Sequence, residues 1–273
     1  MRVFISADIE GVAGVVHGAR ETGSEGLDYG QARRLMTREV NAAIEGALDG
    51  GATAVTVADA HGPHLNLLPE ELHPAARLIR GKPRPLGMVH GVDGGFDLAF
   101  FTGYHVRSGE VGVLNHTYTG YYLDVRVNGR SFGETGLNAA LAGHFGVPLA
   151  LVTGDGGVCA EAAALVEGGL ETVAVKEAIG RYAADSLHPE AARDAIRVAA
   201  RRALERRAEW RPFVVAGPVR LEAAFATTAH ADLAALIPTV ERVDGRTVAY
   251  DAPDYLAAYR MLRAITVISG APV

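Results

Sequence analysis

Short apolar runs alternate with helical patterns along the first two thirds of the chain. Four of these runs have the length and the flanking residues of buried strands, and they cover 2–7, 52–62, 96–105 and 147–155. Apolar residues recur at helical spacing over 29–49, after Asp28 as a predicted N-cap, and again over 133–146. Strands that alternate with helices predict an α/β fold, with a mainly parallel central sheet flanked by helices.

The last third of the chain predicts a mixed α+β portion. We expect a helix over 157–167, a strand over 171–176, a long helix over 190–209 and a last helix from about residue 253. Asn128-Gly129, inside 124–132, and Asp244-Gly245 are dipeptides typical of hairpin turns. The sequence contains no repeat, low-complexity segment or clear linker, so we expect one compact unit over 1–273.

Polar side chains stand where the predicted strands end. Glu10 follows Asp8 with one residue between them, so both project to the same face of an extended chain. Two like charges that close repel each other by about 1 to 4 kcal/mol. In an open parallel sheet the carboxyl ends of the strands meet at one edge, and ligands bind there. The side chains brought to this edge are Asp8, Glu10, Asp59, His61, His105 and Asp155.

A metal ion would explain such a cluster, because carboxylates crowded at a dry edge must share protons or bind a cation. The histidines favour zinc, manganese, cobalt or iron over magnesium and calcium, which prefer oxygen ligands. Two histidines with three carboxylates are enough ligands for two metal ions, an arrangement that activates water in hydrolytic enzymes. Each residue alone also has a structural explanation, with Asp59 as a loop or helix cap, His105 as a hydrogen-bonded interior histidine and Asp155 as a turn former.

Three further residues carry candidate chemistry. His116 lies in a loop, away from any strand end, and is either a proton carrier or oxyanion donor or a hydrogen-bonded loop histidine. Glu134 lies in the first turn of the helix over 133–146, where compensation of the helix dipole explains an acidic residue without any function. His17 follows a glycine-rich loop and is a candidate for the substrate side. That loop lacks the GxGxxG spacing of dinucleotide-binding proteins.

Composition narrows the classes of partner. The chain has 273 residues, 49% of them hydrophobic, which is enough for a large buried core. With 21% charged residues and a net charge of −6, it has no electrostatic footprint for a nucleic acid. One cysteine, Cys159, excludes an intrachain disulfide and favours a reducing compartment. We find neither a secretory signal pattern nor an apolar run of about 20 residues, so we expect a cytoplasmic protein without a membrane partner.

Five motifs occur in a fixed order within 6–157, namely SADIEGVAG, DAHG, GYH, NHT and GETGLN. This set resembles the D-aminopeptidases of peptidase family M55, typified by the dipeptide-operon enzyme. The resemblance implies a dinuclear zinc aminopeptidase that hydrolyses short peptides with D-amino acids, such as D-Ala-D-Ala. It also implies a homodecamer of stacked rings. The motifs fall almost entirely within 1–155, so we expect 156–273 to complete the fold and to carry assembly contacts.

The resemblance also implies a role for each motif residue. Asp8 would bridge two zinc ions, for which manganese or cobalt could substitute. Glu10 and His61 would complete one metal site, and His105 and Glu134 the other. His116 would match the catalytic histidine of the family. Asp59 is then a candidate partner that orients the ring of His61 or His105.

Two other classes of function stay open on the sequence. A calcineurin-like metallophosphoesterase also uses D-x-H, G-D and N-H motifs, although there D-x-H lies on the first strand and G-D precedes N-H. In this chain the motif at the end of the first strand is DIE, and TGDGG comes after NHT, so the order of the motifs differs from that of the phosphoesterases. A non-catalytic peptide- or amine-binding module would grip a ligand amine with the same carboxylates, and it would hold no tightly bound metal.

Overall fold

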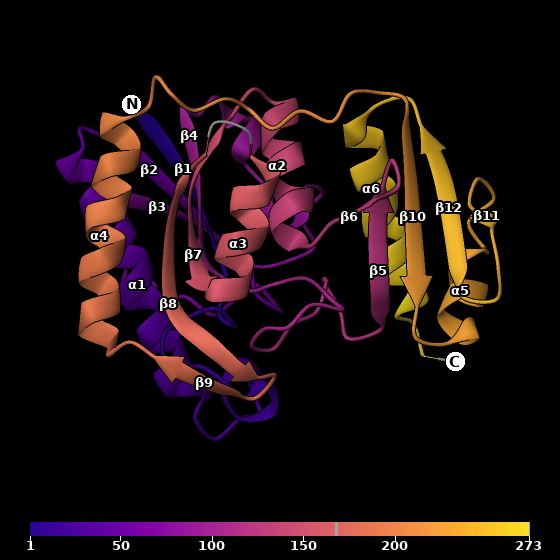
Figure 1. Ribbon diagram of the computed structural model, residues 1–273, viewed down its shortest axis with the longest axis horizontal. Coiled ribbons are helices and arrows are strands. Elements are labelled where there is room, and N and C mark those ends of the chain that lie inside the picture. The colour runs from indigo at the N-terminus through magenta and orange to yellow at the C-terminus, as the bar shows by residue number, and fades with distance from the viewer. Residues whose placement is uncertain (167–168, 273) are drawn as a thin grey trace.

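The computed structural model describes residues 1–166 and 169–272, and its larger sheet has seven strands in the order β3-β2-β1-β4-β7-β8-β9 (Figure 1). All neighbouring strands are parallel except β8 and β9, which are antiparallel. The strands are β1 (Arg2–Ala7), β2 (Ala54–Asp59), β3 (Ala76–Ile79), β4 (Leu98–Tyr104), β7 (Leu149–Asp155), β8 (Glu171–Gly180) and β9 (Ala183–Ser186). The prediction of a mainly parallel central sheet is confirmed.

Helices cover both faces of this sheet (Figure 1). One face carries α1 (Tyr29–Asp49) and α4 (Pro189–Glu205), and the other carries α2 (Glu134–His144) and α3 (Gly156–Leu165). Val3 and Ile5 of β1 belong to the core beneath α1 and α4, whereas Phe4 belongs to the core on the opposite face. Both faces of the strand are therefore buried, which explains why its sequence is continuously apolar.

A second sheet of five antiparallel strands, in the order β11-β12-β10-β5-β6, stands beside the first (Figure 1). Helix α6 (Tyr255–Ser269) fills the space between this sheet and α2, and α5 (Thr228–Ala234) packs against α6. The strands are β5 (Tyr122–Val127), β6 (Arg130–Ser131), β10 (Val219–Phe225), β11 (Glu241–Arg242) and β12 (Thr247–Ala252). β10, β11, β12, α5 and α6 belong to the mixed α+β C-terminal portion that the sequence predicts, and β5 and β6, from the chain before it, complete the sheet.

Most predicted elements occur close to their expected places. Asn128 and Gly129 join β5 to β6 with φ values of 51° and 78°, the left-handed pair that a two-residue hairpin requires. The predicted strand over 171–176 continues to Gly180, and the helix predicted over 190–209 ends at Glu205. Residue 167, the predicted end of the helix after 156, lies outside the described residues. The sequence analysis missed β3 and β9, which are short strands near or at the edges of the larger sheet, the short helix α5, and β10, the central strand of the second sheet.

No helix in the described part of the chain has both the length and the apolar character that crossing a membrane requires.

Candidate metal centre

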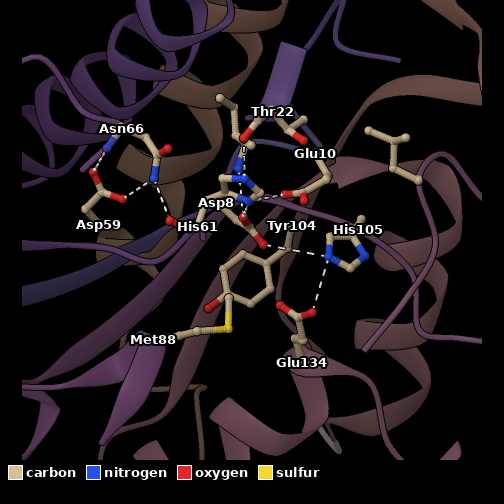
Figure 2. A network of polar contacts seen from close by, with 12 residues as sticks. Asp8, Glu10, Thr22, Asp59, His61, Asn66, Met88, Tyr104, His105 and Glu134 are labelled. Carbon is tan, nitrogen blue, oxygen red and sulfur yellow. Dashed lines mark hydrogen bonds and ion pairs between the residues drawn. The ribbon is translucent and has the colours of Figure 1, made fainter. Parts of the chain in front are cut away.

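Six predicted site residues converge at the carboxyl edge of the parallel sheet, five of them labelled in Figure 2. The sheet order makes β2, β1 and β4 neighbours, so the residues that follow these three strands meet. The other two residues are Glu134, at the start of α2, and His116, in the loop between β4 and β5. The six residues are Asp8, Glu10, His61, His105, His116 and Glu134.

Asp8 lies between two histidines and turns one carboxylate oxygen to each. Its Oδ1 lies 3.2 Å from Nδ1 of His61, and its Oδ2 lies 3.8 Å from Nε2 of His105. Glu10 approaches the same His61 nitrogen at 2.8 Å, and Glu134 approaches the same His105 nitrogen at 3.4 Å. The cluster thus has two halves, one with Glu10 and His61 and one with His105 and Glu134, and Asp8 belongs to both (Figure 2).

His116 borders the second half of the cluster. Its Nε2 lies 3.7 Å from Oε1 of Glu134, and its ring stacks on that of His105 with centroids 4.2 Å apart. Burial and the neighbouring His105 lower the pKa of His116. His116 is therefore a neutral imidazole at the border of the site, unlike the two histidines that contact Asp8.

Backbone carbonyls fix the orientation of all three rings. Nε2 of His61 lies 2.7 Å from the Thr22 oxygen, Nδ1 of His105 lies 3.0 Å from the Val106 oxygen, and Nδ1 of His116 lies 2.8 Å from the Leu114 oxygen. In the neutral tautomer the N–H donates to the carbonyl and the other ring nitrogen, without a proton, faces the carboxylates. The buried Nε2 of His105 has no hydrogen-bond partner in the described part of the chain. These donors fit a metal ion of the zinc type.

Without a metal, protons balance the charges of the cluster. Burial and the neighbouring Glu10 raise the pKa of Asp8 to about 8. Burial also opposes the charged form of His105, but Glu134 outweighs it and the pKa of His105 rises to about 10. Burial opposes ionisation of Glu10 as well, yet His61 holds the pKa of Glu10 well below its usual range. A metal ion bound here would replace protons on the ligands, so its affinity rises with pH.

Two glycines bring the residues after β1 close to the end of β4. A Cβ atom on Gly11 would lie 1.8 Å from the main-chain oxygen of Tyr104, and one on Gly103 would lie 2.2 Å from the main-chain oxygen of Asp8. Gly103 also has a φ of 67°, which side chains rarely adopt. The Gly11 N–H donates to the Gly103 carbonyl at 2.8 Å. This close contact sets Asp8 beside His105.

Asp59 does not contact either histidine ring, so the prediction that it orients one is wrong. Its carboxylate accepts hydrogen bonds from the Asn66 side chain at 2.7 Å and from the N–H groups of Asn66 and Leu67 at 2.6 and 2.7 Å. Asn66 Nδ2 also donates to the main-chain oxygen of His61 at 2.7 Å (Figure 2). Asp59 therefore stabilises the backbone of the loop that carries His61, and it does not orient the imidazole ring directly.

Asp155 has the structural role that the sequence left open. Its side chain accepts the Val158 N–H at 3.2 Å as the N-cap of α3, and it accepts the Val113 N–H at 3.0 Å. Asp155 thus joins α3 to the loop that carries His116, and it stands outside the cluster.

Lys176 is a contributor that the sequence analysis missed. It is buried, and its ammonium group donates to the main-chain oxygens of Glu10, Val12 and Val15 at 2.6, 2.8 and 2.5 Å. The only signal in the sequence is a lysine among the apolar residues of the segment VAVKEAIG. Lys176 therefore fixes the loop that carries Glu10.

Two cavities open beside the cluster. One of about 370 Å³ is lined by Asp8, His61, His116 and Glu134 together with residues of α6. The other, of about 490 Å³, is lined by Glu10, His116, Thr22 and His17 among others. His17, the predicted candidate for the substrate side, thus borders a cavity that reaches the cluster. A buried set of carboxylates and imidazoles with open space on both sides defines the class of site, a hydrolase-type metal centre in an α/β fold.

Comparison with known proteins identifies the family. The chain belongs to peptidase family M55, the D-aminopeptidases, whose family model matches residues 1–264. A D-aminopeptidase of Bacillus subtilis strain 168 is 35% identical over 270 residues, which cover 98% of each chain. The solved structure of the zinc-dependent D-aminopeptidase DppA from Bacillus subtilis, described as a self-compartmentalizing protease, matches with a TM-score of 0.96 at 34% identity. That match covers 100% of this chain and 99% of the other. The family suggested by the five motifs is confirmed.

Proposed function

We propose that this protein is an aminopeptidase that uses two zinc ions to hydrolyse short peptides, above all dipeptides with D-amino acids such as D-Ala-D-Ala. The observation that carries the proposal is the pair of half-sites that share Asp8, each with one histidine and one glutamate at 2.8 to 3.4 Å from each other. The full-length similarity to a zinc-dependent D-aminopeptidase supports both the metal and the substrate class.

Each half-site would hold one ion. Glu10 and His61 would bind the first, His105 and Glu134 the second, and Asp8 would bridge them. When bound, the two ions would supply a water of lowered pKa and polarise the scissile carbonyl group. The ring orientations support this assignment, because a backbone carbonyl engages the outer nitrogen of each ring, and Nδ1 of His61 and Nε2 of His105 face the carboxylates, where a metal ion would replace the proton.

His116 would carry protons during the reaction. Its Nδ1–H is engaged by the Leu114 carbonyl, which leaves Nε2 free to accept a proton and to pass it to the leaving amine. Its lowered pKa keeps it neutral near pH 7, as a general base requires. The contact between the Tyr118 N–H and Glu134 Oε1, at 2.6 Å, orients the carboxylate beside it.

We also propose that the protein assembles into a homo-oligomer, a decamer by resemblance to its family, in which 156–273 supplies assembly contacts to a single catalytic unit. The similarity to the Bacillus subtilis enzyme, which is described as a self-compartmentalizing protease, supports this assembly. Enclosure would restrict substrates to short peptides. Light scattering of the purified protein measures the number of subunits directly, and a monomer at micromolar concentration would contradict the assembly.

The decisive experiment is hydrolysis of D-Ala-D-Ala and L-Ala-L-Ala by the zinc-loaded protein and by a Glu134→Ala variant, with a phosphomonoester assayed in parallel. We expect cleavage of the D-dipeptide by the wild type and loss of both cleavage and zinc in the variant. Inertness of the wild type to all short peptides would overturn the peptidase function, and turnover of the phosphomonoester alone would favour a phosphoesterase. A variant with full activity and both metals would overturn the ligand assignment.

A further inference from the structure

We propose that Lys82 and Arg263 form a binding site for the C-terminal carboxylate of the peptide substrate, in the cavity of about 370 Å³ beside the cluster. This inference rests on the proposed peptidase function and adds the group that the enzyme recognises at the far end of its substrate. The site selects short peptides with a free carboxylate over amidated peptides.

Both cationic side chains line the same cavity as the candidate metal ligands. Asp8, His61 and Glu134 form part of its wall, and Lys82 and Arg263 form another part. The guanidinium carbon of Arg263 lies 5.6 Å from the centroid of the Tyr118 ring, and the Tyr118 N–H donates to Glu134 Oε1 at 2.6 Å. Tyr118 therefore contacts both Arg263 and a candidate metal ligand, which places the guanidinium group on the cavity wall beside the cluster.

Within the described part of the chain, neither cation has an anionic partner of its own. Across 1–166 and 169–272, no carboxylate lies at ion-pair distance from Lys82 or Arg263, and the buried Nε of Arg263 makes no hydrogen bond. Arg206 and Arg220, by contrast, each pair with two carboxylates. In a chain of net charge −6, two unpaired cations facing a cavity are ready to receive an anion.

Arg84 adds a third positive charge to this wall, and the pKa of the neighbouring His64 responds to the three charges. Arg84 donates to the main-chain oxygens of Asp59 and Ile79, which fixes its charge next to Lys82 without neutralising it. Burial and the nearby charges of Arg84, Lys82 and Arg263 lower the pKa of His64 to about 3, so His64 stays neutral. Three cations close to one point repel each other, and a bound carboxylate would relieve the repulsion through charge-assisted hydrogen bonds.

The charges of the cavity match a peptide with a free C-terminal carboxylate. The acidic cluster, once it holds its metal ions, takes the scissile carbonyl group, and the cations take the carboxylate beyond it. An arginine suits this task because its planar donors match the two carboxylate oxygens, while the lysine adds a point charge. Substrate orientation then follows from two fixed contacts, one at each end of the reacting residue.

The test compares D-alanyl-D-alanine with its C-terminal amide, using the zinc-loaded full-length protein and four variants. Arg263→Gln and Lys82→Gln remove one charge each, and Arg263→Lys retains it. Arg260→Gln removes a charge of the same helix that lines the adjacent cavity but not this one, and it is the matched control.

We expect the wild type to favour the free acid by between about 10-fold and 100-fold in kcat/KM. Arg263→Gln and Lys82→Gln should lose most of that preference, because cleavage of the free acid falls much further than cleavage of the amide. Arg263→Lys should retain part of the preference, and Arg260→Gln all of it. Equal cleavage of both substrates by the wild type, or an equal loss on both in the charge-removing variants, would overturn the proposal. Cleavage of neither substrate by the wild type would instead overturn the peptidase function, and with it the site.

Discussion

The ammonium group of Lys176 lies 2.6 Å from the main-chain oxygen of Glu10, so a buried lysine on β8 holds a candidate metal ligand that follows β1. The other two donors of the same group reach Val12 and Val15. All three protons of the ammonium group are thus donated in hydrogen bonds to one loop. The position of Glu10 therefore depends on a strand that is more than 160 residues away in the sequence.

Replacement of Lys176 by Met should destabilise the protein and weaken its metal site. Three main-chain oxygens would lose a charged donor in a buried loop, which we expect to cost about 2 to 4 kcal/mol in the free energy of unfolding. Zinc affinity should fall by about tenfold or more, because the support of a ligand is lost. Denaturant unfolding in EDTA and competition with a zinc chelator measure the two effects. Arg201→Met, at an exposed position of α4, controls for the loss of one cation, and a Lys176→Met variant with wild-type zinc affinity would show that other contacts hold the loop.

The rings of His105 and His116 stack on each other, yet we expect their replacement to have different effects on zinc binding. His116→Asn should retain two zinc ions and lose about 100-fold or more in kcat, because a proton carrier is removed while the proposed ligands stay. His105→Asn should lose zinc as well as activity, because His105 faces both Asp8 and Glu134. Metal analysis beside steady-state kinetics separates the two. Loss of zinc from His116→Asn would instead make His116 a ligand, in the group that it forms with Glu10 and His105.

Removal of metal should lower the melting temperature. Asp8, Glu10 and Glu134 are buried within one cluster, and a divalent cation compensates their repulsion better than protons do. At a zinc concentration about 1,000 times the dissociation constant, binding stabilises the folded state by about 4 kcal/mol. Scanning calorimetry before and after EDTA measures the change, and added zinc should reverse it while magnesium should not. A melting temperature that EDTA leaves unchanged would argue against a metal centre.

Parallel strands made much of the site predictable. A strand end is a local feature, and the carboxyl ends of neighbouring parallel strands meet whatever the rest of the fold does. This is why Asp8, His61 and His105 could be brought together from the sequence. Strand ends alone do not place Glu134, because an acidic residue in a first helical turn has the same sequence signal whether it faces solvent or His105. The prediction of Glu134 as a ligand comes from the GETGLN motif and the family resemblance that it carries.

Other features depend on contacts that leave no local trace. Asp59 and Asp8 both stand at the end of an apolar strand, and only the loop N–H groups of Asn66 and Leu67 distinguish their roles. The second sheet pairs Leu221 with Val127, nearly a hundred residues apart, so its strand order is a tertiary property. In the sequence, Lys176 is only a polar residue that interrupts an apolar strand. Its role depends on the position of the loop after β1, which only the folded structure gives.

Glu39 gives the protein a pH dependence that is independent of the metal. This glutamate of α1 is 3% exposed, and its Oε1 accepts the Ala13 N–H at 2.8 Å while its Oε2 has no hydrogen-bond partner within the described residues. Burial raises the pKa of Glu39 to about 7, above the ordinary value of 4.5. Between these two values the folded protein keeps a proton that the unfolded chain releases, so the contribution of Glu39 to stability falls as pH rises.

A Glu39→Gln variant should therefore gain stability relative to the wild type as pH rises from about 4.5 to 7. We expect the difference in unfolding free energy to change by about 2 to 3 kcal/mol across this range and to level off above it. Denaturant unfolding of both proteins in EDTA, at intervals of pH, measures the difference without metal binding. Glu45→Gln, at a half-exposed position of the same helix, controls for the loss of one carboxylate. If the difference between Glu39→Gln and wild type stays flat across this range, the buried carboxyl group does not change its protonation on folding.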